Sequence, residues 1–78
     1  MLVEIRNIED DGETISCTYY PERKINDEKR LTISKKTGEI VSYSGDQKYS
    51  MYRGMARTLL EDQIGKDEYP EFAVMQCG

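Results

Sequence analysis

The side chains that could do chemistry in this sequence are a basic segment with tyrosines in it, two cysteines and an acidic turn. Residues 23–57 carry nine Lys and Arg against four acids, a net charge of +5, and include Tyr43, Tyr49 and Tyr52. Basic side chains neutralise phosphates and aromatic rings stack on unpaired bases, so this composition could form a nucleic-acid-binding surface. The candidate contact residues are Lys29, Arg30, Lys35, Lys36, Arg53 and Arg57.

The same basic residues have a plainer interpretation. The solvent faces of strands must be polar, and lysines often protect edge strands. Residues 1–22 and 58–78 carry net charges of −5 and −4, so the whole chain is at −4. That negative charge opposes long-range attraction to a polyanion. Nucleic-acid binding is therefore kept as the alternative hypothesis.

Groups suited to catalysis are sparse. The chain has no His, and a nucleophilic Cys normally needs a neighbouring base. Two isolated cysteines do not make a zinc site, and the acidic turn at 9–13 lacks the ligand spacing of a calcium loop. Glycine-rich phosphate-binding motifs are also absent. We expect no enzymatic activity, no catalytic residues, no cofactor and no metal.

The sequence predicts a cytoplasmic protein. No apolar run approaches the roughly 18 to 20 residues that cross a bilayer, and the first residues do not resemble a secretory signal. In a reducing compartment Cys17 and Cys77 are free thiols, and Cys17 serves as a small apolar residue. A disulfide between them is the alternative in an oxidising compartment.

Alternating apolar and polar residues predict four strands in the first part of the chain. The clearest runs over residues 14–20, where Ile15, Cys17 and Tyr19 share one face. Turns with glycine separate the first and second strands and the third and fourth strands, and Pro21 ends the second. The four predicted strands are residues 2–8, 14–20, 29–34 and 39–43.

A helix is predicted over residues 47–64. Tyr52, Met55, Ala56 and Leu59 recur at the spacing of one buried stripe, which Tyr49 and Leu60 widen. Ser44 or Asp46 can cap its start and Gly65 can end it, and a last strand follows at residues 72–75.

These elements predict one small α+β domain spanning residues 1–78. It has a mainly antiparallel sheet of four to five strands in the order β-β-β-β-α-β, with one helix packed on one face. Its most favoured function is a non-enzymatic protein-interaction module, such as a regulator, inhibitor or accessory subunit. The partner is expected to be another protein, with a second copy of the chain as a further option and no membrane involved. Nucleic acid remains the less favoured partner.

Overall fold

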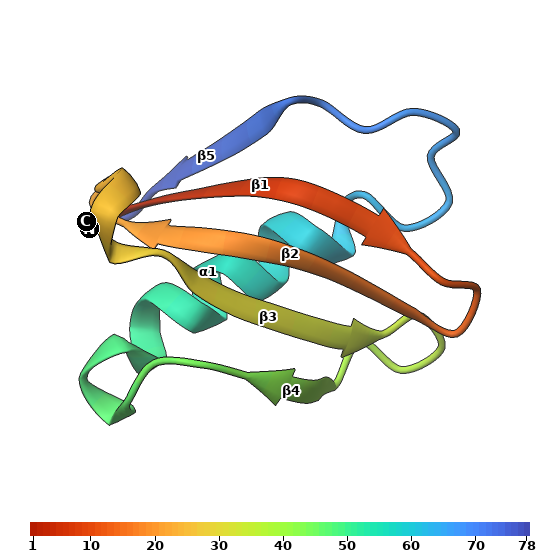
Figure 1. Cartoon of the computed structure of the whole chain (residues 1–78), viewed down its shortest axis with the longest axis horizontal. Helices are drawn as coiled ribbons and strands as arrows, with labels where there is room; N and C mark the ends of the chain where they lie inside the picture. Colours follow the sequence, from red (N-terminus) through yellow and green to blue (C-terminus); the bar gives the residue numbers. More distant parts are fainter.

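The computed structural model describes residues 1–78, and its elements follow the predicted order β-β-β-β-α-β. Two short 3-10 helices, Ile25–Asp27 and Gln47–Tyr49, lie between these elements. The fold is α+β, with one helix packed on an antiparallel sheet (Figure 1). The main elements are β1 (Leu2–Asp10), β2 (Thr14–Pro21), β3 (Lys29–Ser34), β4 (Ile40–Tyr43), α1 (Ser50–Glu61) and β5 (Phe72–Gln76).

The five strands form one sheet in the order β4-β3-β2-β1-β5, and every neighbouring pair is antiparallel. The first four strands lie in the order in which the chain makes them. The last strand returns past α1 to pair with β1, so β4 and β5 are the two edges (Figure 1). The helix packs against β1, β2, β3 and β5, and β4 projects beyond it.

The turn between β1 and β2 is the acidic turn that the sequence placed at residues 9–13. The Asp11 carboxylate accepts hydrogen bonds from the backbone N–H groups of Glu13 and Thr14, at 3.0 and 2.8 Å. Gly12 has φ +100°, a conformation in which a side chain would be strained. The acidic residues therefore have a local structural role in closing this hairpin.

The helix is shorter than predicted at both ends. Asp46 accepts a hydrogen bond from the Lys48 N–H, so residues 47–49 wind as a 3-10 turn and α1 begins at Ser50. After Glu61, backbone bonds such as Gln63 N–H to Leu60 O skip only three residues, which ends regular α-helical winding before Gly65. The prediction of residues 47–64 was therefore wrong at its boundaries.

The third strand has the predicted bounds, whereas the other four strands differ from the predictions by one or two residues. The first strand continues to Asp10, because a bulge after Arg6 lets pairing with β2 resume at Glu9. Asn7 sits in this bulge with φ 55°, a conformation that Asn tolerates better than most residues. The fourth strand starts at Ile40 and the last ends at Gln76.

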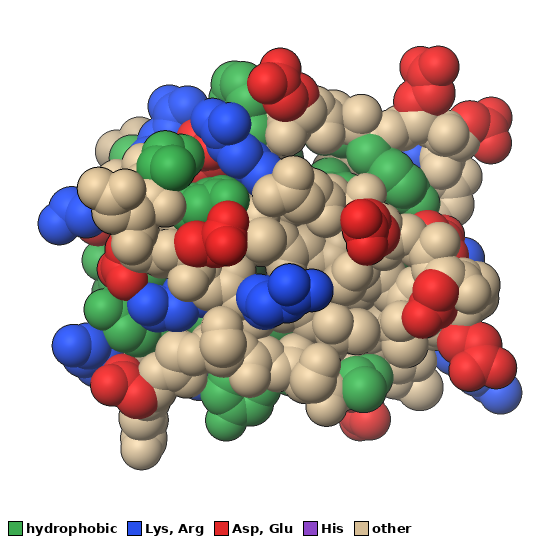
Figure 2. Space-filling view, in the orientation of Figure 1, with side chains coloured by type: hydrophobic (Ala, Val, Ile, Leu, Met, Phe, Trp, Pro, Cys, Tyr) green, Lys and Arg blue, Asp and Glu red, His purple; other side chains and the backbone are tan.

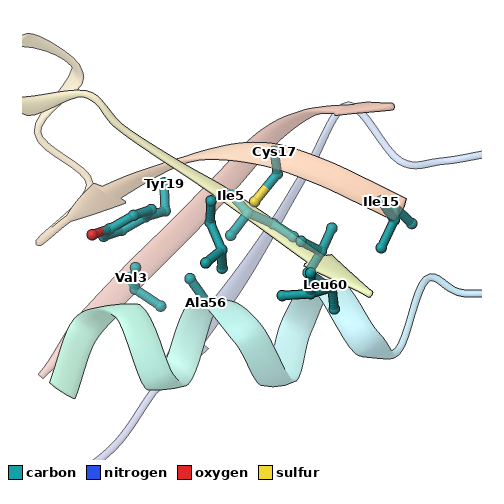
Figure 3. Packing of buried hydrophobic residues seen from close by; sticks show 9 residues of the cluster. Val3, Ile5, Ile15, Cys17, Tyr19, Ala56 and Leu60 are labelled. Atoms are coloured by element: carbon teal, nitrogen blue, oxygen red, sulfur yellow. The ribbon is translucent and has the colours of Figure 1, made fainter. Parts of the chain in front are cut away.

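The core lies between α1 and the three central strands. Ala56 and Leu60 of the helix face Val3, Ile5 and the inward side chains of β2 (Figure 3). The alternation in β2 is confirmed, since Ile15, Cys17 and Tyr19 all belong to this core, together with Leu31 and Ile33 of β3. Each of these side chains is removed from water, which is the main favourable term in a domain of this size.

Truncating Leu60 tests whether this packing controls stability. Leu60 is fully buried, so Leu60→Ala should lower the free energy of unfolding by about 3 kcal/mol, from lost burial and the cavity left behind. Thr58→Ala, an exposed position on the same helix, should change it by less than about 0.5 kcal/mol. Urea unfolding followed by circular dichroism measures both, and equal losses would contradict this core.

The two thiols should differ sharply in reactivity. Both cysteines are free in the structure, Cys17 buried and Cys77 exposed, and burial raises the pKa of the Cys17 thiol to about 12. Near pH 8, Cys17 is therefore almost entirely protonated and also shielded from reagents. A disulfide-exchange reagent should react with one thiol per native chain and with two after denaturation. Zero native thiols would instead indicate a disulfide.

Candidate interaction surface

Three of the six basic residues singled out from the sequence are in ion pairs. Hydrogen bonding from Lys35 keeps the pKa of the Asp10 carboxyl below its ordinary value, and Lys29 does the same for Asp27. These acids already neutralise much of the positive charge that a bound phosphate would otherwise contact. The three pairs are Lys29 Nζ with Asp27 Oδ1 at 2.7 Å, Lys35 Nζ with Asp10 Oδ2 at 2.7 Å, and Arg57 Nη1 with Glu61 Oε1 at 2.9 Å.

Arg53 and Arg57 reach from α1 to the two ends of β4. Arg53 is buried, and its Nη1 donates to Tyr19 Oη and to the Gly45 carbonyl, both at 3.3 Å. Its guanidinium also lies over the Tyr43 ring, 4.0 Å from the centroid. Arg57 Nη1 donates to the Gly38 carbonyl at 3.2 Å, just before the strand. These arginines therefore hold an edge strand in place.

The remaining two residues, Arg30 and Lys36, are exposed and form no ion pair, but they lie apart. Arg30 pairs with Thr18 across the sheet and points to the helix-free face, whereas Lys36 lies in the turn at the other end of β3. Arg53, by contrast, comes from the helix side. The structure thus distributes the six predicted residues over both faces and does not gather them into one surface.

The edge strand β4 is poorly suited to pairing with a further strand. It has only four residues, and its register with β3 shifts between Thr32 and Ile33. Ile40, Val41 and Tyr43 are well exposed because α1 does not extend over this strand. Short length and a bulge are two devices by which proteins keep an edge strand from pairing with foreign chains.

The edge at β5 is one residue longer than β4 and has no bulge. Its five residues pair with β1 in an unbroken register from Phe72–Arg6 to Gln76–Leu2, and none of them is charged or Pro. Met1 and Cys77 exchange backbone hydrogen bonds. In an antiparallel ladder every second residue bonds to the partner strand, so Ala73 and Met75 also direct their backbone groups toward β1. The N–H and C=O groups of Phe72, Val74 and Gln76 therefore point outward, away from any strand.

Partly exposed apolar side chains accompany this edge on the helix side. Arg53 and Arg57 occupy the flank of α1 that faces β4, so Met55 and Leu59 lie on the opposite flank, toward β5. Both are half-buried and pack against the core, as do Ala73 and Met75 of β5. An added strand would find hydrogen-bonding groups at the edge and apolar surface beside it.

On the helix-free face, a buried carboxylate lies beside β5. Glu4 is only 1% exposed and is paired with the Nε groups of Arg6 and of Arg23, the latter at 2.6 Å. Burial acts to raise the pKa of Glu4, but the hydrogen bonds from the two arginines outweigh it and leave the pKa below its ordinary value. Phe72 is 42% exposed, and the centroid of its ring lies 5.6 Å from the guanidinium carbon of Arg6 and 5.4 Å from that of Arg23.

Sequence reasoning missed this group, which we call the arginine pair (Arg6 and Arg23, with Glu4 and Phe72). In the sequence, Glu4 and Arg6 are the ordinary polar positions of an alternating strand. Arg23 reaches Glu4 because Glu22 and Arg23 both adopt positive φ, 54° and 58°, immediately after Pro21. Two successive non-glycine residues in that conformation have no local sequence signal.

Acidic side chains gather at the end of the molecule that carries the β1–β2 turn (Figure 2, right). Tyr69 joins the segment before β5 to this turn, since its hydroxyl lies 3.3 Å from Asp10 Oδ2. A hollow of about 460 Å³ opens there, lined mainly by polar residues that include Glu9, Asp11 and Thr14. No group of three or more His, Cys, Asp or Glu side chains is arranged to hold a metal ion. The single α-helix is too short and too polar to span a membrane.

Comparison with known proteins gives no relatives. No protein-family model matches the chain, and no curated protein or solved structure matches it either.

Replacing Glu4 tests the arginine pair. Glu4→Gln should lower the free energy of unfolding at pH 7 by about 1–3 kcal/mol, because a buried charge-assisted contact is lost. The folded pKa of Glu4 lies below its ordinary value of 4.5, so its stabilising effect is complete above that pH and is lost as pH falls through the folded pKa. Urea unfolding at several pH values should show the two proteins converging as the pH falls below 4.5 and through the folded pKa of Glu4. Equal stability at pH 7 would contradict the assignment.

Proposed function

We propose that this protein is a non-enzymatic interaction module that binds an extended segment of a partner protein along the open edge of β5. The main support is the contrast between the two edges. β4 has four residues and a register shift against β3, whereas β5 has five residues in unbroken register with β1. Neither strand contains a charged residue, so the bulge is the protective feature that β5 lacks. Unprotected edges are templates for strand addition, in which backbone bonds supply affinity and alternate side chains supply specificity.

The surface beside β5 suits this role. Phe72, Val74 and Gln76 offer up to six backbone hydrogen bonds to an incoming chain. On the helix side, Met55 and Leu59 are partly exposed and would be covered by the alternate side chains of that chain. Methionine is well suited to such a contact because its side chain is flexible and adapts to different neighbours.

Matched substitutions on the two edges test the proposal. The tagged protein is used to capture partners from native lysate, with Val74→Lys on β5 compared with Val41→Lys on β4. Both replace an edge valine by a charged residue. Val74 is half-buried and lies across from Glu4, whereas Val41 is exposed, so a second β5 variant is needed as well. Partners captured by the wild type should be lost from Val74→Lys and kept by Val41→Lys, at least tenfold apart in yield if one blocked edge costs about 1.4 kcal/mol.

A second variant separates loss of docking from loss of folding. In Val74→Pro the missing N–H is one that points outward, so the β1–β5 ladder keeps its bonds. This variant should also fail to capture partners while its circular dichroism spectrum stays native. Capture that depends on Val41 and is unaffected at Val74 would place docking on β4 and overturn the proposal.

Nucleic-acid binding by the basic segment stays the alternative. It predicts that captured material is lost after nuclease treatment, that affinity falls steeply with salt, and that charge reversal at Lys35 and Lys36 weakens binding. Arg30 and Lys36 are the exposed basic residues of that set that form no ion pair. The intramolecular contacts of the other four favour protein docking over this alternative.

A further inference from the structure

The arginine pair has donor groups that the protein itself does not use. Arg6 and Arg23 each bond Glu4 through Nε, and no Nη group of either makes a hydrogen bond to the protein. Their side chains are 35% and 44% exposed. A guanidinium that is held at Nε and open at Nη is oriented in advance to receive a carboxylate.

This pair lies at one end of the open edge. Arg6 is directly across from Phe72 in the register, and both guanidinium groups lie near the Phe72 ring. Phe72 is also the first residue of β5, with its backbone groups turned outward. In antiparallel addition, the incoming residue opposite Phe72 would place its side chain on the same face, about 5 Å away between Cβ atoms.

Building on the proposed function, we propose that the segment bound at β5 carries an acidic residue opposite Phe72, whose carboxylate binds the Nη groups of Arg6 and Arg23. Arg6 and Arg23 share the single buried carboxylate of Glu4 as their ion-pair partner. Glu71 is the other carboxylate that acts on Arg6, and it forms no ion pair there. The incoming carboxylate would complete this arrangement.

The same chemistry argues against a second copy of the chain as the occupant. If two β5 strands paired about a two-fold axis at Val74, Phe72 of one copy would lie opposite Gln76 of the other. No residue of β5 is acidic, so self-pairing in that register would leave the arginine pair without a carboxylate. A segment of a different protein, with an acidic residue at one fixed position, fits the surface better.

Selection from a random octapeptide display library tests this inference on the full chain. The protein is immobilised by biotin on a cysteine introduced by Thr58→Cys, with Cys77→Ser, so that the tag lies on the exposed side of α1, away from β5. Wild-type protein should select peptides with alternating apolar residues and Asp or Glu at one fixed position. Selected peptides are then measured against Arg23→Gln, with Lys24→Gln as the matched control for the loss of one positive charge.

The expected result is an affinity loss of about tenfold for acidic peptides with Arg23→Gln and with Arg6→Gln, and little change with Lys24→Gln. Replacement of the peptide's acid by its amide should cause a similar loss in the wild type and a smaller loss in Arg23→Gln, where only Arg6 still faces the acid. Circular dichroism shows whether each variant folds, and two separate arginine variants guard against the failure of one.

The outcomes separate the two proposals. Peptides that need Val74 but show no acidic preference would overturn the arginine inference and leave strand addition supported. Peptides that bind equally to Val74→Pro, or no enrichment at all, would overturn the proposed function and the inference together. Association of the wild type into dimers that Val74→Pro abolishes would assign the edge to a second copy and overturn the choice of a foreign segment.

Discussion

The constraint on which the rest of this structure depends is that one helix must cover a sheet about twice its width. Five strands at a spacing of about 4.8 Å span roughly 19 Å, whereas a helix with its side chains is about 10 Å across. The fully buried core is therefore limited to the central strands and two helix residues, Ala56 and Leu60. Both sheet edges and the helix-free face lie outside that strip, so their side chains must be stabilised by interactions other than burial under the helix.

On the helix-free face, the chain uses charge. Tyr20 is buried there and donates its hydroxyl to Glu28 at 2.7 Å, and the carboxylate of Glu4 is covered by two arginines. Burying charges is expensive, and a well-packed apolar group would often give equal stability. The presence of a buried Glu4 with two arginines therefore has a natural explanation if the outer Nη groups of these arginines bind a ligand, which is the role proposed for them above.

The two edges are treated differently, and the helix is the reason. Arginines on one flank of α1 extend to β4 and fix its ends, with Arg53 over Tyr43 and Arg57 on the Gly38 carbonyl. The other flank carries Met55 and Leu59 and leaves apolar surface beside β5. A sheet edge with bare backbone groups and adjacent apolar surface is the combination that strand addition requires.

Several features of this protein were determined by the sequence itself. The sequence predicts the β2 strand from the alternation in residues 14–20 and two tight turns from Gly12 and Gly38. It also predicts which face of the helix packs on the sheet from the apolar stripe. Strand order, by contrast, was decided by tertiary structure, because the pairing of β5 with β1 joins residues some seventy positions apart and no local pattern encodes it. The same applies to the site. Arg53 and Arg57 were candidate nucleic-acid contacts in the sequence, yet packing directs them to backbone carbonyls. Nothing in the sequence distinguishes Glu4, Arg6 and Arg23 from ordinary surface residues. Only the turn after Pro21 brings them together, at one end of the β5 edge.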